Sequence, residues 1–234
     1  MIKFTKEPEI KFISHLDLMR TIQRMIRRSG LPAQYSNGFN PHMSLSIAQP
    51  LPVGMYSSGE YMDAVFDTEI DGKIISDSLN KSAPHGIRIL EAFKIRSVKE
   101  GEKKIPQSMA AIDAAKYSAK IKYTDISNLE GDIKYISDKK EWNIQKKTKT
   151  TEKEVDLKPL VKKLNYKITG DILNITAIIA CGSRENLSFE LLCDFFKKYS
   201  SNADTDAFTD IERKELYALL ENEYVPLDSY FRHF

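Results

Sequence analysis

Residues 16–29 are the feature that most constrains the fold, because they form an amphipathic helix with two sharply different faces. Ser14 is a suitable N-cap before this helix, and Gly30 is a suitable stop after it. At 3.6 residues per turn, the apolar face consists of Leu18, Met19, Ile22, Met25 and Ile26. The opposite face, within about 100° of arc, carries Asp17, Arg20, Arg24, Arg27 and Arg28. Such a helix must bury its apolar side, so we expect it to pack on a sheet.

Strand and helix patterns on both sides of this helix predict an α+β fold. Apolar or alternating stretches indicate strands, and turn formers such as Pro8 separate them. The expected elements are strands at 2–5 and 10–13, the helix at 16–29, strands at 43–48 and 60–68, a helix at 70–79 and a strand at 86–95. We interpret this series as the β-α-β-β-α-β order of ferredoxin-like proteins.

The second part of the chain repeats this alternation of strands and helices. Strands are expected at 114–123, 142–147, 152–157, 172–181 and 208–217, and helices at 126–137, 158–164 and 188–199. We therefore predict two tandem ferredoxin-like αβ sandwiches with mainly antiparallel sheets. The N-terminal domain is expected at 1–97 and the second domain at 110–234, with a linker at 98–109.

Composition excludes several classes of protein. The chain has 35 Lys+Arg against 33 Asp+Glu, a net charge of +2, and 41% hydrophobic residues. Its 2 cysteines cannot build a disulfide framework, and no Cys/His cluster suggests zinc or an iron–sulfur centre. No apolar stretch is long enough for a signal peptide or a membrane span. We expect a folded cytoplasmic protein without a metal, a cofactor or a membrane partner.

The arginine face suits a polyanion. Arginine is planar, permanently charged and bidentate toward phosphate. Residues 1–28 carry seven lysines and arginines against three acidic residues, and residues 29–72 carry no lysine or arginine at all. The lysine-rich stretch at 94–167 has acidic residues interleaved and is typical of solvated surface. The alternative is a helix that complements its own dipole, with Asp17 pairing Arg20. Binding of an anion or nucleic acid by Arg20, Arg24, Arg27 and Arg28 is the prediction that we retain.

Residues 37–42, Asn-Gly-Phe-Asn-Pro-His, predict a sharply bent loop. Phe39 or Tyr35 could stack on a base or a flat cofactor. The alternative makes Phe39 a core anchor and His42 an ordinary loop residue. The candidate site residues are Asn37, Asn40 and His42 for anion binding, with Gly38 and Pro41 shaping the loop.

Residues 51–61 form a third candidate segment. Gly54 permits backbone conformations closed to other residues and is expected to shape a loop. The hydroxyls of Ser57 and Ser58 are candidates for anion binding. Glu60, like Asp17, is a candidate for orienting an arginine or a histidine. A plain loop that enters a strand is the alternative interpretation.

Known catalytic motifs are absent: the sequence has no Walker loop, GxGxxG, HExxH or GxSxG. His42 and Ser44 match one half of the two-histidine phosphoesterase pattern, but no second half exists. His15 and His42 remain candidates for general acid–base catalysis in a metal-independent RNase. Cys181 is either buried packing or a nucleophile.

Several separated motifs together resemble a bacterial family of radical-SAM-linked proteins of unknown function. The motifs are residues 12–20, Arg27-Arg28, residues 38–42, residues 51–54, Ser57 and Ser58, and Glu60-Tyr61. The resemblance is dense over residues 1–66. Proteins of this family are often fused to a radical SAM protein and are commonly encoded near an RNase of the E/G type and ribosomal-protein genes. This chain lacks the radical-SAM cysteine triad, so it resembles the free-standing form.

The resemblance and the arginine face together favour a cytoplasmic accessory protein that binds RNA, with tRNA and rRNA as candidate partners. A module that docks on a radical SAM enzyme is the second hypothesis. A metal-independent RNase is the third, supported by a fold-level similarity to the ferredoxin-like endoribonucleases that process CRISPR repeat RNA.

Overall fold

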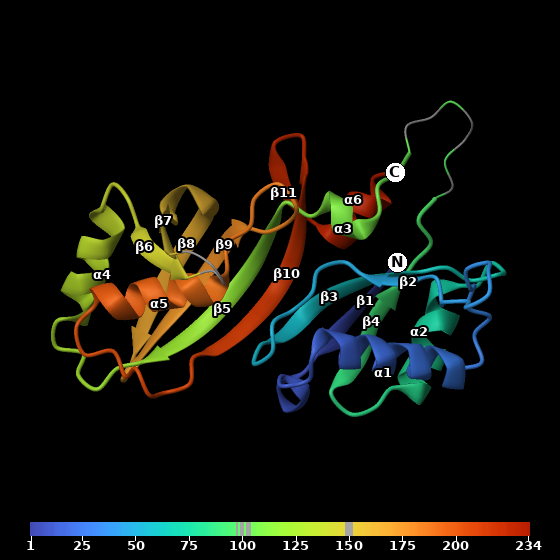
Figure 1. The fold of residues 1–234 in the computed structure, drawn as a ribbon, viewed down its shortest axis with the longest axis horizontal. Helices are drawn as coiled ribbons and strands as arrows, with labels where there is room; N and C mark the ends of the chain where they lie inside the picture. The colour runs from blue at the N-terminus through green and yellow to red at the C-terminus, as the bar shows by residue number, and fades with distance from the viewer. Residues whose placement is uncertain (97, 99–100, 102–103, 148–151) are drawn as a thin grey trace. The chain divides into compact units, whose positions relative to one another are not determined.

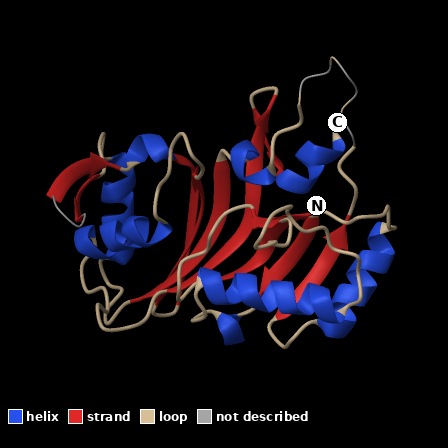
Figure 2. Cartoon of the chain, turned by 45° about the vertical axis from the view of Figure 1, so that its right-hand side comes forward, coloured by secondary structure: helices blue, strands red, loops and turns tan. Residues whose placement is uncertain are grey.

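The computed structural model describes residues 1–96, 98, 101, 104–147 and 152–234. These residues form two compact units, both with mixed α+β structure and mostly antiparallel strand pairing (Figures 1 and 2). Unit 1 comprises Met1–Asp113 and Arg213–Phe234, and unit 2 comprises Ala114–Glu212. The division differs from the predicted one, because the last part of the chain belongs to unit 1. Residues 97, 99–100 and 102–103 of the linker region lie outside the described residues.

Apart from the strand expected at 10–13, unit 1 begins with the predicted order of elements. The elements are β1 (Ile2–Lys6), the 3-10 helix η1 (Pro8–Ile10), α1 (His15–Arg28), β2 (Leu45–Ile47), β3 (Tyr56–Ala64), α2 (Gly72–Ser82) and β4 (Ile87–Ala92). The strands lie in the order β4-β1-β3, and β2 also pairs with β3. The pairs β1–β3, β1–β4 and β2–β3 are antiparallel. The β-α-β-β-α-β order is confirmed, whereas the tandem ferredoxin-like arrangement stays a prediction.

The C-terminal part of the chain extends this sheet. It contributes β10 (Asp210–Leu220), β11 (Glu223–Pro226) and α6 (Leu227–Arg232). β10 lies beside β3, and β11 pairs with β10 as an antiparallel hairpin. A Cβ atom at Gly59 of β3 would lie 2.5 Å from the carbonyl oxygen of Lys214 in β10, so only glycine permits this close approach. β11 and α6 were not predicted, nor was the short α3 (Ser108–Ala111).

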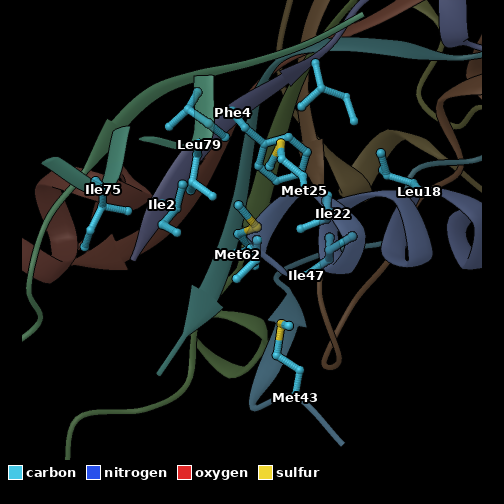
Figure 3. Close-up of a cluster of buried hydrophobic side chains, with 14 residues drawn as sticks. Ile2, Phe4, Leu18, Ile22, Met25, Met43, Ile47, Met62, Ile75 and Leu79 are labelled. Carbon is cyan, nitrogen blue, oxygen red and sulfur yellow. The ribbon is translucent and has the colours of Figure 1, made fainter. Parts of the chain in front are cut away.

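Helices α1 and α2 cover one face of the sheet of unit 1, and the core lies beneath them (Figures 1 and 3). Alternation along β1 explains this arrangement, because Ile2 and Phe4 are buried in the core and Lys3 between them points to the other face. Facing them, α1 contributes Leu18, Ile22, Met25 and Ile26. The predicted apolar face is therefore the buried face of α1.

The strand predicted at 10–13 is wrong. Pro8 begins the 3-10 helix η1 instead, and the backbone N–H groups of Ile10 and Lys11 donate to the carbonyls of Glu7 and Pro8. Proline favours the first position of a helical turn because it has no N–H to leave unpaired. The buried ammonium group of Lys6 then donates to the carbonyls of Lys11 and Ile13, at 3.0 and 3.3 Å. The apolar residues at 10–13 thus belong to a turn that leads into α1.

Unit 2 contains most of the predicted elements of the second part of the chain. They are β5 (Ala114–Lys122), α4 (Leu129–Asp138), the hairpin of β6 (Asn143–Lys147) and β7 (Glu152–Asp156), β9 (Ile172–Ala180) and α5 (Phe189–Tyr199). β9 pairs antiparallel with both β5 and β8 (Val161–Thr169). Residues 148–151 lie outside the described residues.

The helix predicted at 158–164 is wrong beyond its first turn. Residues Lys158–Leu160 form a 3-10 helix, η2, and β8 follows immediately. The reason is that β8 and β9 form a hairpin with a tight turn at Gly170 and Asp171. Gly170 has a φ of 58°, and Thr169 pairs with Ile172 across the turn. A Gly-Asp turn between strand-like stretches favours a hairpin. Pairing with β9 therefore determines the structure of the segment.

Candidate nucleic-acid interface

Helix α1 is built to keep its charged face outward. Ser14 caps the helix: its hydroxyl oxygen accepts a hydrogen bond from the Asp17 backbone N–H at 3.2 Å, and its O–H donates to the Asp17 carboxylate at 2.7 Å. The hydrogen bond from Ser14, together with the Arg20 and Arg24 charges, holds the pKa of Asp17 below its ordinary value. Asp17 therefore stays ionised and stabilises the positive N-terminal end of the helix.

The four arginines are all exposed, but their contacts differ. Arg20 forms an ion pair with Asp17 at 3.2 Å, with both side chains more than half exposed. Arg28 donates to the carbonyl of Ser82 at the end of α2, at 2.8 Å. Arg27 donates through Nε to the Tyr35 hydroxyl at 3.4 Å. Arg24 forms no hydrogen bond or ion pair with another residue in the described part of the chain. An exposed ion pair such as Asp17–Arg20 is weak, so it leaves the arginine available to an anion.

The predicted bent loop is the tip of a small two-stranded ribbon. The backbones of Tyr35 and Met43 form an antiparallel β-bridge. The Ser36 N–H donates to the His42 carbonyl at 2.8 Å, and the His42 N–H donates to the Ser36 hydroxyl at 2.9 Å. Met43 is buried in the core and anchors the returning strand. Because the ribbon is closed at its base, residues 37–41 project as an exposed tip.

The exposed tip contains the predicted loop residues. Gly38 has a φ of 127°, a conformation that disfavours other residues. Phe39 is fully exposed, at 109% of its reference area, so the alternative of a core anchor is wrong. Asn37, Asn40, Pro41 and His42 are also exposed. The Arg27–Tyr35 hydrogen bond joins the base of this loop to the arginine face, so these two predicted parts of the site are neighbours.

The third candidate segment is separate from this surface and largely internal. Ser57 and Ser58 belong to β3 and not to a loop, because β3 begins earlier than predicted, and Glu60 lies in the same strand as expected. Ser57 is buried, and its hydroxyl donates to the Arg213 carbonyl at 2.8 Å, so the prediction that it binds an anion is corrected. Ser58 is exposed on the same strand. Gly54 is buried with a φ of 92°, and its N–H donates to the Lys11 carbonyl at 2.8 Å.

Glu60 does not orient an arginine of α1 or a histidine. It pairs with Arg213 of β10, and the side chains of the two residues are 1% and 0% exposed. The Arg213 guanidinium also donates to the Gln49 and Pro50 carbonyls, at 2.7 and 3.4 Å. Sequence reasoning missed this pair, because 153 residues separate its members. The predicted role of Glu60 is corrected accordingly: it neutralises a buried guanidinium.

A second charged cluster that the sequence did not reveal lies on the face of the sheet opposite α1. Lys3 contacts Glu215 at 2.7 Å and Asp228 at 3.0 Å, and the Tyr61 hydroxyl donates to Glu215 at 2.7 Å. Burial and the adjacent Glu215 carboxylate raise the pKa of Tyr61. Burial alone would lower the pKa of Lys3, but Glu215 and Asp228 outweigh it and raise the pKa. These groups satisfy one another and hold β1, β10 and α6 together.

The two candidate histidines do not form one catalytic centre. His15 is the first residue of α1, and its Nδ1 is buried with no hydrogen-bond partner among the described residues. His42 is exposed beside Tyr35, close to the other end of α1. A helix of 14 residues is about 21 Å long. The two side chains therefore cannot act on the same phosphate.

Unit 1 also contains a cavity of about 620 Å³ at a different place. Its walls include Asp63, Phe66, Phe93 and Arg96, and none of the predicted site residues lines it. Asp63 accepts hydrogen bonds from the backbone and the hydroxyl of Ser108 in α3. The cavity is therefore distinct from the surface formed by the arginine face and the loop.

Comparison with known families matches most of the chain. The profile of an uncharacterised protein family conserved in bacteria (DUF2344) matches residues 1–188. The chain belongs to this family. The match includes α1, the loop at 37–42 and β3, and thus the whole candidate interface. None of the curated proteins compared with the chain matches its sequence. Within the described residues, no helix is both long and apolar enough to span a membrane.

Proposed function

We propose that this protein binds RNA through the arginine face of α1 and the adjacent loop at 37–42. The observation that carries the proposal is the Arg27–Tyr35 hydrogen bond, which places an exposed row of guanidinium groups beside an exposed, bent loop. Guanidinium groups bind phosphate oxygens in a bidentate manner, and asparagine and histidine side chains supply further hydrogen bonds. Both the charge and the polar groups are directed to solvent.

The distribution of charge in the first 72 residues supports this choice of site. The total charge is only +2, so affinity for a polyanion must come from a local concentration of positive charge. The exposed face of α1 provides it, and the region from residue 29 to residue 72 adds no cation. Two of the four guanidinium groups are held by uncharged oxygens, of Tyr35 and Ser82, and so keep their charge uncompensated. An anion is the natural partner for such a row.

The test replaces Arg20, Arg24 and Arg27 together by Gln and measures binding of total cellular RNA by filter retention over a range of salt concentrations. We expect binding to be abolished at physiological salt and the melting temperature to fall by no more than a few degrees, since the three side chains are exposed. At low salt, the slope of log affinity against log salt should fall by about 2, because three phosphate contacts are lost.

The matched control replaces Lys120, Lys163 and Lys167 by Gln, which removes the same charge from exposed positions of unit 2. This control should bind RNA as the wild type does. Equal loss in both variants would show that only net charge matters, and unchanged binding by the arginine variant would refute the proposal. A partner retained from lysate after nuclease treatment and high salt would favour a protein partner, such as a radical SAM enzyme, over RNA.

A further inference from the structure

We infer that the interface takes an unpaired RNA strand, with a base stacked on the ring of Phe39. This inference rests on the proposed RNA binding and adds to it the class of RNA. It depends on three features of unit 1: the exposure of Phe39, the closed base of its loop, and the position of that loop at one end of the arginine row.

The exposure of Phe39 is the first feature. Its ring is fully exposed, and that of Tyr35 near the base of the loop is 40% exposed. No other large apolar residue of the described chain is exposed as much as Phe39. Both flat faces of the ring are open, so a planar group can stack on it. Stacking of a base on an aromatic side chain contributes about 1–3 kcal/mol and tolerates any sequence.

The closed base of the loop is the second feature. The Tyr35–Met43 bridge and the two hydrogen bonds between Ser36 and His42 fix both ends of the five-residue tip. Pro41 restricts the backbone at the end of the tip. A loop that is already closed loses less conformational entropy on binding, so more of the stacking energy remains as affinity.

The third feature is that the loop carrying Phe39 lies at one end of the arginine row. Arg20, Arg24 and Arg27 follow one another along the exposed side of α1, which is about 21 Å long. The Arg27–Tyr35 hydrogen bond places the aromatic loop at the C-terminal end of this row. A strand whose phosphates follow the arginines therefore brings its bases to the loop. This combination of a basic track and an aromatic ring is typical of single-strand binding.

An RNA duplex cannot contact both the arginine row and the Phe39 ring. In an RNA duplex the base faces are stacked on one another and the deep major groove is too narrow for side chains to read. Only the arginine row would then contact the ligand, and Phe39 would remain in water. The structure thus predicts preference for the unpaired form of the same sequence.

The experiment measures fluorescence anisotropy with a labelled RNA of about 12 nucleotides, alone and annealed to its complement. The proteins are the wild type, Phe39→Ala, Phe39→Leu and Phe39→Tyr. We expect Phe39→Ala to weaken single-strand binding about tenfold, Phe39→Leu to weaken it similarly, and Phe39→Tyr to bind within about twofold of the wild type. Duplex affinity and the salt slope should be the same for all four proteins, because no charge changes.

Several results would overturn the inference. One is that Phe39→Ala binds the single strand as tightly as the wild type does. Another is that Phe39→Leu binds it as tightly as Phe39→Tyr does. A third is that Phe39→Ala loses as much affinity for duplex RNA as for the single strand. In each case RNA binding itself survives, provided that the triple arginine variant still fails to bind. If the wild type binds neither form, both proposals are refuted. A DNA strand of the same sequence shows whether the 2′-hydroxyl contributes.

Discussion

Arginine occupies two opposite environments in unit 1, and the difference shows which guanidinium groups the fold itself uses. Arg213 is completely buried in the sheet, paired with Glu60 and hydrogen-bonded to two carbonyl groups. Arg20, Arg24, Arg27 and Arg28 lie on the exposed face of α1, and only Arg20 has an ion-pair partner there among the described residues. The buried guanidinium has its hydrogen-bonding capacity used inside the protein. The exposed ones face solvent, where the proposed RNA ligand would bind.

The largest effect on stability is expected from replacing the buried arginine, which tests its structural role. Arg213→Met leaves the Glu60 carboxylate in the core without its ion-pair partner, and we expect the free energy of unfolding to fall by about 3–5 kcal/mol in urea denaturation. The double variant Glu60→Leu/Arg213→Met should recover part of this loss, because neither member of the pair is left without the other. The recovery is incomplete, because the buried Lys6 ammonium loses the attraction of the Glu60 carboxylate. A loss below about 1 kcal/mol in the single variant would contradict the structural role.

A second, smaller effect involves the half-buried cluster around Lys3. Burial alone would raise the pKa of Asp228, but the hydrogen bond and charge of Lys3 outweigh it and lower the pKa below the ordinary 3.8. Asp228 therefore binds a proton more readily in the unfolded protein than in the folded one. The ionised Asp228 carboxylate stabilises the folded protein above pH 3.8, and this stabilisation is lost as the pH falls through the folded pKa.

Comparison of the wild type with Asp228→Asn tests this pH dependence. The free energy of unfolding of the wild type should decrease more than that of the variant between about pH 5 and pH 2. Urea denaturation at several pH values provides the measurement, and Asp77→Asn is a control, since Asp77 is exposed on α2 and forms no hydrogen bond or ion pair in the described part of the chain. Parallel curves for the wild type and Asp228→Asn would show that Lys3 does not stabilise the ionised carboxylate.

The smallest effect on stability should come from Arg24→Gln. This side chain is exposed, so the free energy of unfolding should change by less than about 0.5 kcal/mol. RNA affinity should nevertheless fall severalfold, and the salt slope by about 0.7. Lys163→Gln is the matched control and should change neither quantity. A loss of stability comparable to that of Arg213→Met would show that Arg24, like Arg213, has a structural role.

Local patterns predicted much of the fold. The amphipathic helix at 16–29 became α1 with the expected faces, because helical periodicity and Ser14 capping act within the segment itself. The strand at 10–13 failed because Pro8 favours a helical turn, and the helix at 158–164 failed because β8 pairs with β9. In the second case a partner elsewhere in the chain outweighed local preference.

The candidate site shows the same limit. The arginine face and the loop at 37–42 were visible because each lies in one continuous segment. The role of Glu60 was not visible, since its partner Arg213 lies 153 residues away. Ser57 similarly looked free in the sequence, and its burial follows only from the position of β10 beside β3. Contacts between distant segments decide which polar residues remain accessible.

The return of the chain to unit 1 at residue 213 has a consequence for biosynthesis. While the ribosome is still making residues 114–212, the N-terminal segment already contains Glu60 but has no Arg213 to neutralise it. The sheet of unit 1 then lacks β10, and its Glu60 carboxylate must stay hydrated or protonated. Unit 2, by contrast, is continuous and needs no later residue. Completion of the N-terminal fold is therefore a late event, which must await translation of the C-terminal strand.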